Sequence, residues 1–135
     1  MLFNHLLTNV LIVEDNEVDH FVMNKLIKTV HNYAKIITCY NGKFAIETLI
    51  HLKETDAALL PQFIFLDLSM PVMDGWQFLD EFKRLNIDVA GRIKIYILTF
   101  SIFKKDLIRS YSYPFVTEFI SKPVSLTHIR SLITS

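Results

Sequence analysis

The sequence predicts an α/β fold in which one parallel β-sheet is wrapped by helices. Short apolar runs alternate along the chain with stretches whose apolar residues recur every three or four positions, which is typical of such a sheet. The apolar runs lack polar alternation, as strands buried on both faces do. The length of 135 residues corresponds to one domain, so we expect residues 1–135 to form a single domain with no further domain.

Five apolar runs are the predicted strands: residues 10–13, 36–40, 63–66, 93–98 and 116–120. The first run ends an uncharged stretch from Met1 to Val13. No Lys or Arg precedes the apolar run within this stretch, and Glu14 and Asp15 follow it, which is the wrong charge order for a signal peptide. We therefore expect this stretch to form a strand.

Five predicted helices alternate with the strands, and each has an apolar stripe at helical spacing. The stripes are Val18, Val22, Leu26 and Val30; Ala45, Ile46, Leu49 and Ile50; Phe78, Leu79, Phe82 and Leu85; Ile102, Phe103, Leu107, Ile108 and Tyr111; and Leu126, Ile129, Leu132 and Ile133. The dipeptides Asn41-Gly42 and Asp74-Gly75 are expected to open the second and third helices. The last two helices are more apolar around their circumference, which predicts a partner surface.

The composition argues against several classes of partner. The 14 basic and 14 acidic residues give a net charge of zero without a basic patch, so direct binding of nucleic acid is not expected. No apolar run approaches the roughly 20 residues of a membrane-spanning helix, so we expect no membrane insertion. The single cysteine, Cys39, cannot form an intramolecular disulfide, which favours a reducing compartment and a cytoplasmic protein.

Polar residues of complementary chemistry follow four of the predicted strands. Glu14 and Asp15 follow the first, Asp67 the third, Thr99 the fourth and Lys122 the fifth. Loops at the carboxyl ends of parallel strands form the ligand crevice of an open sheet. Each residue alone has an ordinary structural explanation, but their shared position at one sheet edge predicts a functional site.

The acidic residues of this site predict a bound divalent cation. Two unit charges about 4 Å apart repel by roughly 4 kcal/mol at an effective dielectric near 20, so three carboxylates need compensation. Lys122 and Mg²⁺ are suited to provide it, because the candidate ligands are hard oxygens of Asp15, Asp67, Glu14 and a backbone carbonyl just beyond Asp67. The five histidines are dispersed, which argues against zinc.

Four segments carry these residues: Val10-Leu11-Ile12-Val13-Glu14-Asp15-Asn16, Phe65-Leu66-Asp67-Leu68-Ser69-Met70-Pro71-Val72-Met73-Asp74-Gly75, Ile97-Leu98-Thr99 and Ile120-Ser121-Lys122-Pro123. In this order and spacing the chain resembles a response regulator receiver domain of two-component signalling. The resemblance extends from the first strand to the fifth helix. It implies a flavodoxin-like, doubly wound sheet of five parallel strands in the order 2-1-3-4-5, flanked by five helices.

The resemblance also implies roles for individual residues. Asp67 would accept a phosphoryl group, and Mg²⁺ would be held by Glu14, Asp15, Asp67 and the main-chain carbonyl of Ser69. Thr99 and Lys122 would each contact a phosphoryl oxygen.

Two further residues of the last strand region match the family. Pro123 would follow a cis peptide bond. Phe119 matches an aromatic switch residue that moves together with Thr99.

The function implied is a phosphorylation-dependent switch. A histidine kinase or a histidine phosphotransfer protein would donate the phosphoryl group, and the surface of the fourth helix, fifth strand and fifth helix would change toward an unidentified effector protein. We do not expect a dedicated enzyme, although self-phosphorylation from phosphodonors and slow autodephosphorylation are expected. We expect a monomer or a weak dimer.

Departures from the family pattern leave an alternative open. Phe100 follows Thr99 where a small residue is usual, so its ring could hinder or slow phosphorylation, or simply point away from the site. The segment Ser110-Tyr111-Ser112-Tyr113-Pro114-Phe115 replaces a small turn and could enlarge a partner patch, with Phe115 equally suited to the core. The alternative is a pseudo-receiver, a protein-interaction module that works without phosphorylation. An aspartyl phosphohydrolase is disfavoured, because Ser69 stands where it needs a second Asp.

Overall fold

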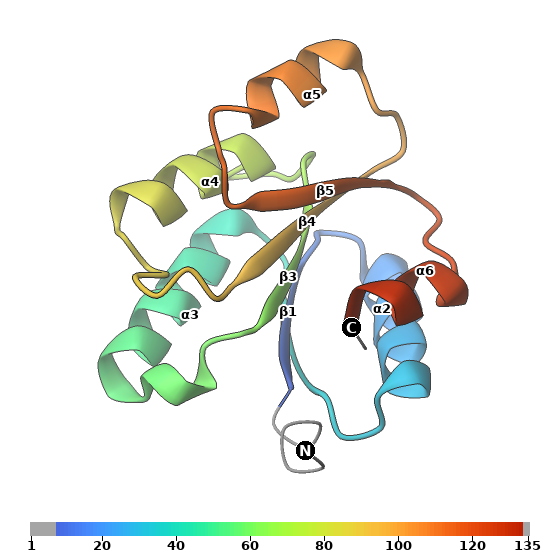
Figure 1. The fold of residues 1–135 in the computed structure, drawn as a ribbon, viewed down its shortest axis with the longest axis horizontal. Helices are drawn as coiled ribbons and strands as arrows, with labels where there is room; N and C mark the ends of the chain where they lie inside the picture. The colour runs from blue at the N-terminus through green and yellow to red at the C-terminus, as the bar shows by residue number, and fades with distance from the viewer. Residues whose placement is uncertain (1–7, 134–135) are drawn as a thin grey trace.

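A computed structural model describes residues 8–133 of the chain. Its centre is a five-stranded parallel sheet in the order β2-β1-β3-β4-β5 (Figure 1). The strands are β1 (Asn9–Val13), β2 (Lys35–Cys39), β3 (Phe63–Asp67), β4 (Lys94–Thr99) and β5 (Val116–Ser121). The predicted fold class and strand order are confirmed. The part of the expected first strand that falls on residues 1–7 lies outside the described residues.

Helices cover both faces of the sheet. They are α2 (Glu17–Val30), α3 (Gly42–Thr55), α4 (Gly75–Arg84), α5 (Lys104–Ser110) and α6 (Leu126–Ile133), with a short 3₁₀ turn η1 (Ala57–Leu59) before β3. In Figure 1, α3 and α4 lie on one side of the sheet, α2 and α6 lie on the other, and α5 lies beside the β5 edge.

Two hydrophobic cores lie between the sheet and its helices. Successive residues of a strand point to opposite faces, so each central strand contributes to both cores. The core under α3 and α4 contains Leu11, Val13, Ile64, Leu66, Ile95 and Ile97. The core under α2 and α6 contains Val10, Ile12, Phe65, Tyr96, Leu98 and Ile120. This double burial explains the unbroken apolar runs in the sequence.

The predicted apolar stripe of the first helix is offset, by part of a helical turn, from the face that α2 buries. Val18 is 67% exposed and Val22 is also exposed, whereas His20, Met23 and Ile27 are the buried residues of α2. The reason is a polar contact: the Nε2–H of His20 donates to the carbonyl oxygens of Glu14 and Cys39, at 2.6 and 3.2 Å. These two hydrogen bonds orient the face of α2 that carries His20 toward the ends of β1 and β2.

The last two helices differ from each other in burial. All seven residues of α5 are described and none is buried, so its apolar side chains remain available for a partner. In α6, however, Ile129, Leu132 and Ile133 are core residues. Tyr113 is also buried and its hydroxyl donates to Asp80 at 2.5 Å, so it belongs to the core and not to a partner patch.

Side-chain caps fix the entry points of α3 and α4, as the dipeptides predicted. Asn41 accepts a hydrogen bond from the N–H of Phe44, and Asp74 forms a capping box with Gln77. Gly75 is required at the start of α4, because a Cβ there would lie 2.8 Å from the Cα of Leu68 and 2.9 Å from the carbonyl oxygen of Asp67. The helix therefore packs directly on the backbone that follows β3.

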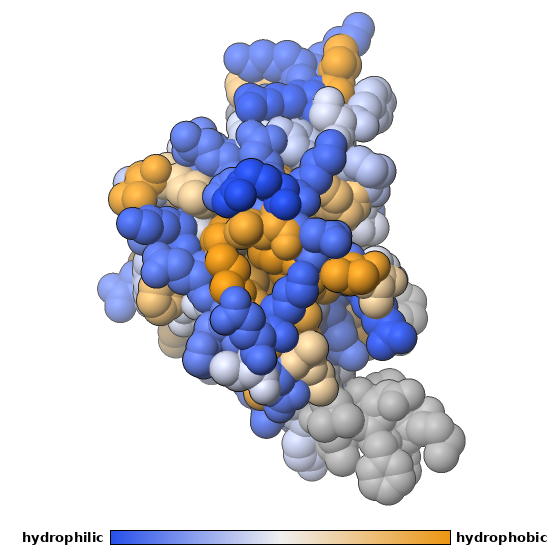
Figure 2. Space-filling view, turned by 90° about the vertical axis from the view of Figure 1, so that its left-hand side faces the viewer, coloured by the Kyte–Doolittle hydropathy of each residue, from blue (hydrophilic) through white to orange (hydrophobic). Residues whose placement is uncertain are grey.

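The side of the molecule that carries α3 and α4 has a small hydrophobic area enclosed by hydrophilic side chains (Figure 2). No helix within residues 8–133 has the length and apolar character needed to cross a bilayer.

We predict that Phe78→Ala lowers the free energy of unfolding by about 3–5 kcal/mol, because Phe78 is fully buried between α4 and the sheet. Phe44→Ala is the matched control, since Phe44 lies on a helix but is exposed, and its cost should stay within about 0.5 kcal/mol. Denaturant unfolding of both variants measures the difference. Equal costs would contradict the assignment of the core.

Candidate functional site

The parallel register of the sheet brings the ends of β1 and β3 together. Val13 pairs with Leu66, so Glu14 and Asp67 become neighbours at the carboxyl edge of the sheet. The loop after β1 is short because α2 begins at once: Asn16 is its N-cap and accepts a hydrogen bond from the N–H of Asp19. The acidic residues are therefore held on a tight strand-to-helix turn.

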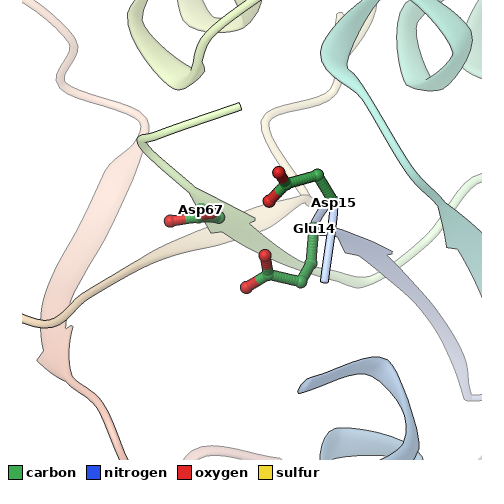
Figure 3. Close-up of side chains that lie close together, drawn as sticks. All are labelled: Glu14, Asp15 and Asp67. Carbon is green, nitrogen blue, oxygen red and sulfur yellow. The ribbon is translucent and has the colours of Figure 1, made fainter. Parts of the chain in front are cut away.

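Three carboxylates gather at this edge (Figure 3). One oxygen each from Glu14, Asp15 and Asp67 lies within 4.8 Å of the others. Glu14 and Asp67 are buried, whereas Asp15 is exposed. The cluster thus has a buried base and one side that is open to solvent.

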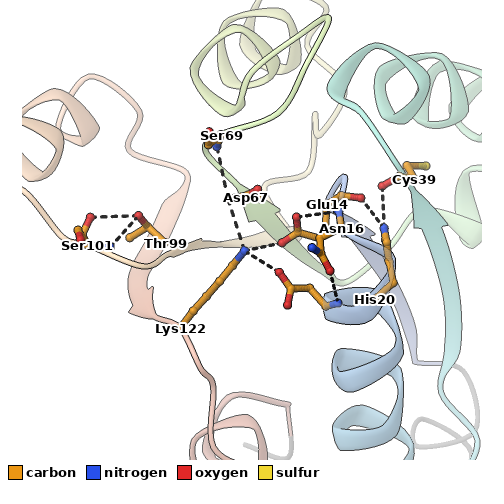
Figure 4. Close-up of polar contacts among 10 residues, drawn as sticks. Glu14, Asn16, His20, Cys39, Asp67, Ser69, Thr99, Ser101 and Lys122 are labelled. Atoms are coloured by element: carbon orange, nitrogen blue, oxygen red, sulfur yellow. Dashed lines mark hydrogen bonds and ion pairs between the residues drawn. The ribbon is translucent and has the colours of Figure 1, made fainter.

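Lys122, in the loop after β5, places its ammonium among these acids (Figure 4). Its Nζ lies 2.5 Å from Oε1 of Glu14, 3.3 Å from Oδ2 of Asp19 and 3.7 Å from Oδ1 of Asp67. The side chain is only 8% exposed. Its main-chain N–H donates to the carbonyl of Thr99 at 2.8 Å, which fastens the loop to β4, and the peptide bond between Lys122 and Pro123 is cis.

Burial and charge shift the proton affinities of the central pair. Burial raises the pKa of the Glu14 carboxyl to about 7; the charge of Asp67 acts in the same direction, and the hydrogen bond and charge of Lys122 oppose it. Burial alone would lower the pKa of Lys122, but the hydrogen bond to Glu14 and the charges of Asp67, Glu14 and Asp19 outweigh it and raise that pKa. The ammonium therefore stays charged, while Glu14 is easily protonated.

In the described structure the hydroxyl of Thr99 and the ring of Phe119 contact groups other than Asp67, although Thr99 lines the same cleft as Asp67. The hydroxyl of Thr99 donates to the carbonyl of Ser101 at 3.0 Å and accepts from the N–H of Ser101 at 3.3 Å, so it is engaged by its own loop. The half-buried ring of Phe119 lies 6.4 Å from the ring of Trp76, between centroids.

Ser69 contacts Asp67, which lies two residues earlier in the chain. Its main-chain N–H donates to Oδ1 of Asp67 at 3.3 Å. This bond places the backbone after β3 beside the carboxylate.

A cleft of about 500 Å³ opens over Asp67. Ser69 and Asp74 line it from the loop after β3, and Thr99, Phe100 and Asp106 line it from the β4 side. The carboxylate of Asp67 thus borders an open space with the volume to receive a small anion.

Asp19 is a site residue that the sequence analysis missed. It lies in the first turn of α2, four residues after Asp15, and it reaches Lys122 from the helix side. Helical spacing gave no signal for this contact, because Asp15 lies before the N-cap of α2 and Lys122 is distant in the sequence. Asp19 adds a further carboxylate beside the ammonium.

The donor set fits a hard divalent cation. Its side-chain ligands are carboxylate oxygens, and Mg²⁺ binds such oxygens while keeping several waters. Asp15 is exposed, so its carboxylate is accessible to a hydrated ion. The tight contact of Glu14 with Lys122 leaves Asp15 and Asp67 as the more available side-chain ligands.

Fold and site together define a protein with an acidic, lysine-compensated cleft at the carboxyl edge of a doubly wound sheet. Comparison with known families identifies it further. The response regulator receiver domain model matches residues 10–134, and the chain belongs to that family.

Individual relatives agree with this assignment. Response regulator Rcp1 of Synechocystis is 33% identical over 102 residues, which span 76% of this chain and 68% of that protein. A two-component response regulator of Cytophaga hutchinsonii has a solved structure similar to this one, with a TM-score of 0.82, 23% identity and coverage of 93% of this chain and 92% of that one. A solved Mn(2+)-bound form of Rcp1 gives a TM-score of 0.69 at 26% identity, covering 92% of this chain and 90% of that one.

We predict that Mg²⁺ binds the protein and that its affinity falls as the pH falls through about 7. Glu14 must be ionised to favour the cation, and its raised pKa makes it protonate in this range. Isothermal titration calorimetry should give an affinity roughly tenfold lower at about pH 6 than at about pH 8.

Glu14→Gln is the control for this prediction, because it keeps the shape of the side chain and removes the titrating group. The variant should bind Mg²⁺ with little pH dependence between these two values. An unchanged slope in Glu14→Gln would show that another group carries the proton.

Proposed function

We propose that Asp67 accepts a phosphoryl group, with Mg²⁺ as cofactor, and that the protein is a phosphorylation-dependent switch of a two-component phosphorelay. The observation that carries this proposal is the pairing of a buried strand-end carboxylate with a buried ammonium: Asp67 and Lys122 lie 3.7 Å apart, and Asp67 lines an open cleft. Phosphoryl transfer needs an in-line nucleophile and positive charge around the transferred oxygens, and this arrangement offers both.

The transfer itself requires little covalent chemistry from the protein. A carboxylate oxygen of Asp67 forms a bond to phosphorus while the bond from phosphorus to the imidazole nitrogen of the donor breaks. The electron pair of the broken bond stays on the imidazole, which takes up a proton. Mg²⁺, when bound by Asp15 and Asp67, would neutralise charge on the phosphoryl oxygens.

The product changes the charge of the cleft. An aspartyl phosphate carries about two negative charges near neutral pH, where the carboxylate carried one, and it adds acceptor oxygens. Lys122 is already in place to meet one of them, and Thr99 lines the same cleft. A hydroxyl of Thr99 that turns toward the phosphoryl group must leave Ser101, and that movement pulls on the loop that leads to α5.

We infer that this movement is read by an effector through α5, β5 and α6. The ring of Phe119 is half-buried on β5 and can follow Thr99 inward, which would alter the neighbouring surface. Receiver domains interact with histidine kinases or phosphotransfer proteins, and a protein of one of these two kinds is the proposed phosphodonor.

We predict that a small phosphodonor with Mg²⁺ adds one phosphoryl group to the wild type and none to Asp67→Asn, because the amide is not a nucleophile of this kind. Intact-mass spectrometry detects the addition. Asp106→Asn is the matched control: Asp106 is an acid of the same cleft, and its loss should leave the addition in place. Absence of modification in the wild type would favour the pseudo-receiver.

A second prediction concerns the switch. Beryllofluoride, which mimics a phosphoryl group, should shift the amide NMR signals of β5 in the wild type in the presence of Mg²⁺. Thr99→Ala should still bind beryllofluoride but show a much smaller shift around Phe119, because the hydroxyl that links cleft and loop is missing. Equal shifts around Phe119 in the wild type and in Thr99→Ala would contradict the proposed coupling between Thr99 and Phe119.

A further inference from the structure

Phe100 has a position that the proposed chemistry does not use. It directly follows Thr99 and is 73% exposed, which is unusual for a phenylalanine. One face of its ring is nevertheless occupied, because Nζ of Lys122 lies 5.0 Å from the ring centroid. An ammonium within about 6 Å of an aromatic centroid is attracted by the negative face of the ring.

The ring completes the enclosure of the Lys122 ammonium. Carboxylates of Glu14, Asp19 and Asp67 lie within 4.0 Å of Nζ, at 2.5, 3.3 and 3.7 Å, and Phe100 contributes the aromatic contact. The lysine side chain is only 8% exposed, so the groups around it have displaced most of its hydration. Cation–π attraction is strongest when the cation is desolvated in this way.

Phe100 is also the shared wall of two cavities. One is the cleft of about 500 Å³ that contains Asp67 and Thr99. The other has a volume of about 130 Å³ and lies toward α2, where Val22 and Leu26 line it together with Lys122. A ring in this place limits the positions that the ammonium can reach on either side.

We propose that Phe100 is a positioning residue for Lys122, holding its ammonium beside Asp67 so that it meets the phosphoryl group. This inference rests on the proposed function and deepens it. Phe100 acts through Lys122 and does not itself contact the reacting atoms. A purely steric role is the competing explanation, in which any bulky side chain at this position would serve.

Leucine separates these two explanations. Phe100→Leu keeps an apolar side chain of substantial bulk but removes the π face, whereas Phe100→Tyr keeps the face. Phe103→Leu is the matched control, because Phe103 is an exposed phenylalanine that lines the same cleft from the same loop. Cation–π positioning requires Phe100→Leu to differ from the other two variants.

The first measurement is the NMR shift of the Lys122 Cε protons, which needs no phosphorylation. The ring current of Phe100 should shift these protons upfield in the wild type, in Phe100→Tyr and in Phe103→Leu. Phe100→Leu should return them toward ordinary lysine values. An unshifted Lys122 in the wild type would overturn the inference, because the ring would then not hold the ammonium.

The second measurement is the affinity for beryllofluoride with Mg²⁺, followed by the fluorescence of Trp76. The chain has one tryptophan, and it lines the cleft. Phe100→Leu should bind beryllofluoride about three- to tenfold more weakly than the wild type, and Phe100→Tyr should stay within about twofold. Equal affinities in the wild type, Phe100→Leu and Phe100→Tyr would contradict the positioning role.

The two proposals fail in different ways. If the wild type does not bind beryllofluoride or accept a phosphoryl group, the proposed function is wrong, and the positioning role is wrong with it. If the wild type binds and Phe100→Leu binds equally well, only the role of Phe100 is wrong. Tighter binding by Phe100→Leu would identify the ring as an obstruction, which also overturns the inference.

Discussion

The charge balance around the Lys122 ammonium is the interaction on which the rest of the site depends. Glu14 and Asp67 are both buried, and their carboxylates belong to a cluster whose ligand atoms lie within 4.8 Å of one another. Exclusion of water strengthens their repulsion as well as their attraction to the lysine. The pKa of Glu14 is raised to about 7, mainly by burial, even with Lys122 at 2.5 Å, so further negative charge in the cluster is unfavourable unless a cation compensates it. In the proposed switch, the charge of a phosphoryl group and the binding of a divalent ion would therefore be linked by electrostatics.

The register of the sheet fixes the relative positions of the strand ends that carry these charged groups. Asp67 pairs with Leu98 and Thr99 with Ser121, so each functional loop leaves the same edge of the sheet at a fixed offset. A slip of one residue would turn every side chain of a strand to the opposite face and would disrupt both hydrophobic cores. Packing and site geometry thus impose the same constraint, and a sequence that satisfies the first also aligns the second.

The sequence predicted the strands well because a parallel strand buried on both faces is a continuous apolar run, whose pattern is local. It also predicted where the acids and Lys122 converge, because strand ends of a parallel sheet share an edge. It failed where a tertiary polar contact decides orientation. His20 turns α2 by bonding two carbonyls, and Asp19 joins the site from the helix. Periodicity carries no information on such contacts.

The uneven burial of the last third of the chain bears on how a switch would work here. None of the residues of α5 is buried and no side chain caps its first turn, so moving it costs little packing energy. The neighbouring β5 is held firmly: Ile120 is in the core, and the N–H of Lys122 donates to the carbonyl of Thr99. In the proposed switch, a displacement of Thr99 therefore moves the following loop and α5 more easily than it moves β5. This asymmetry directs the response of the proposed switch toward α5, because that is where the fold opposes it least.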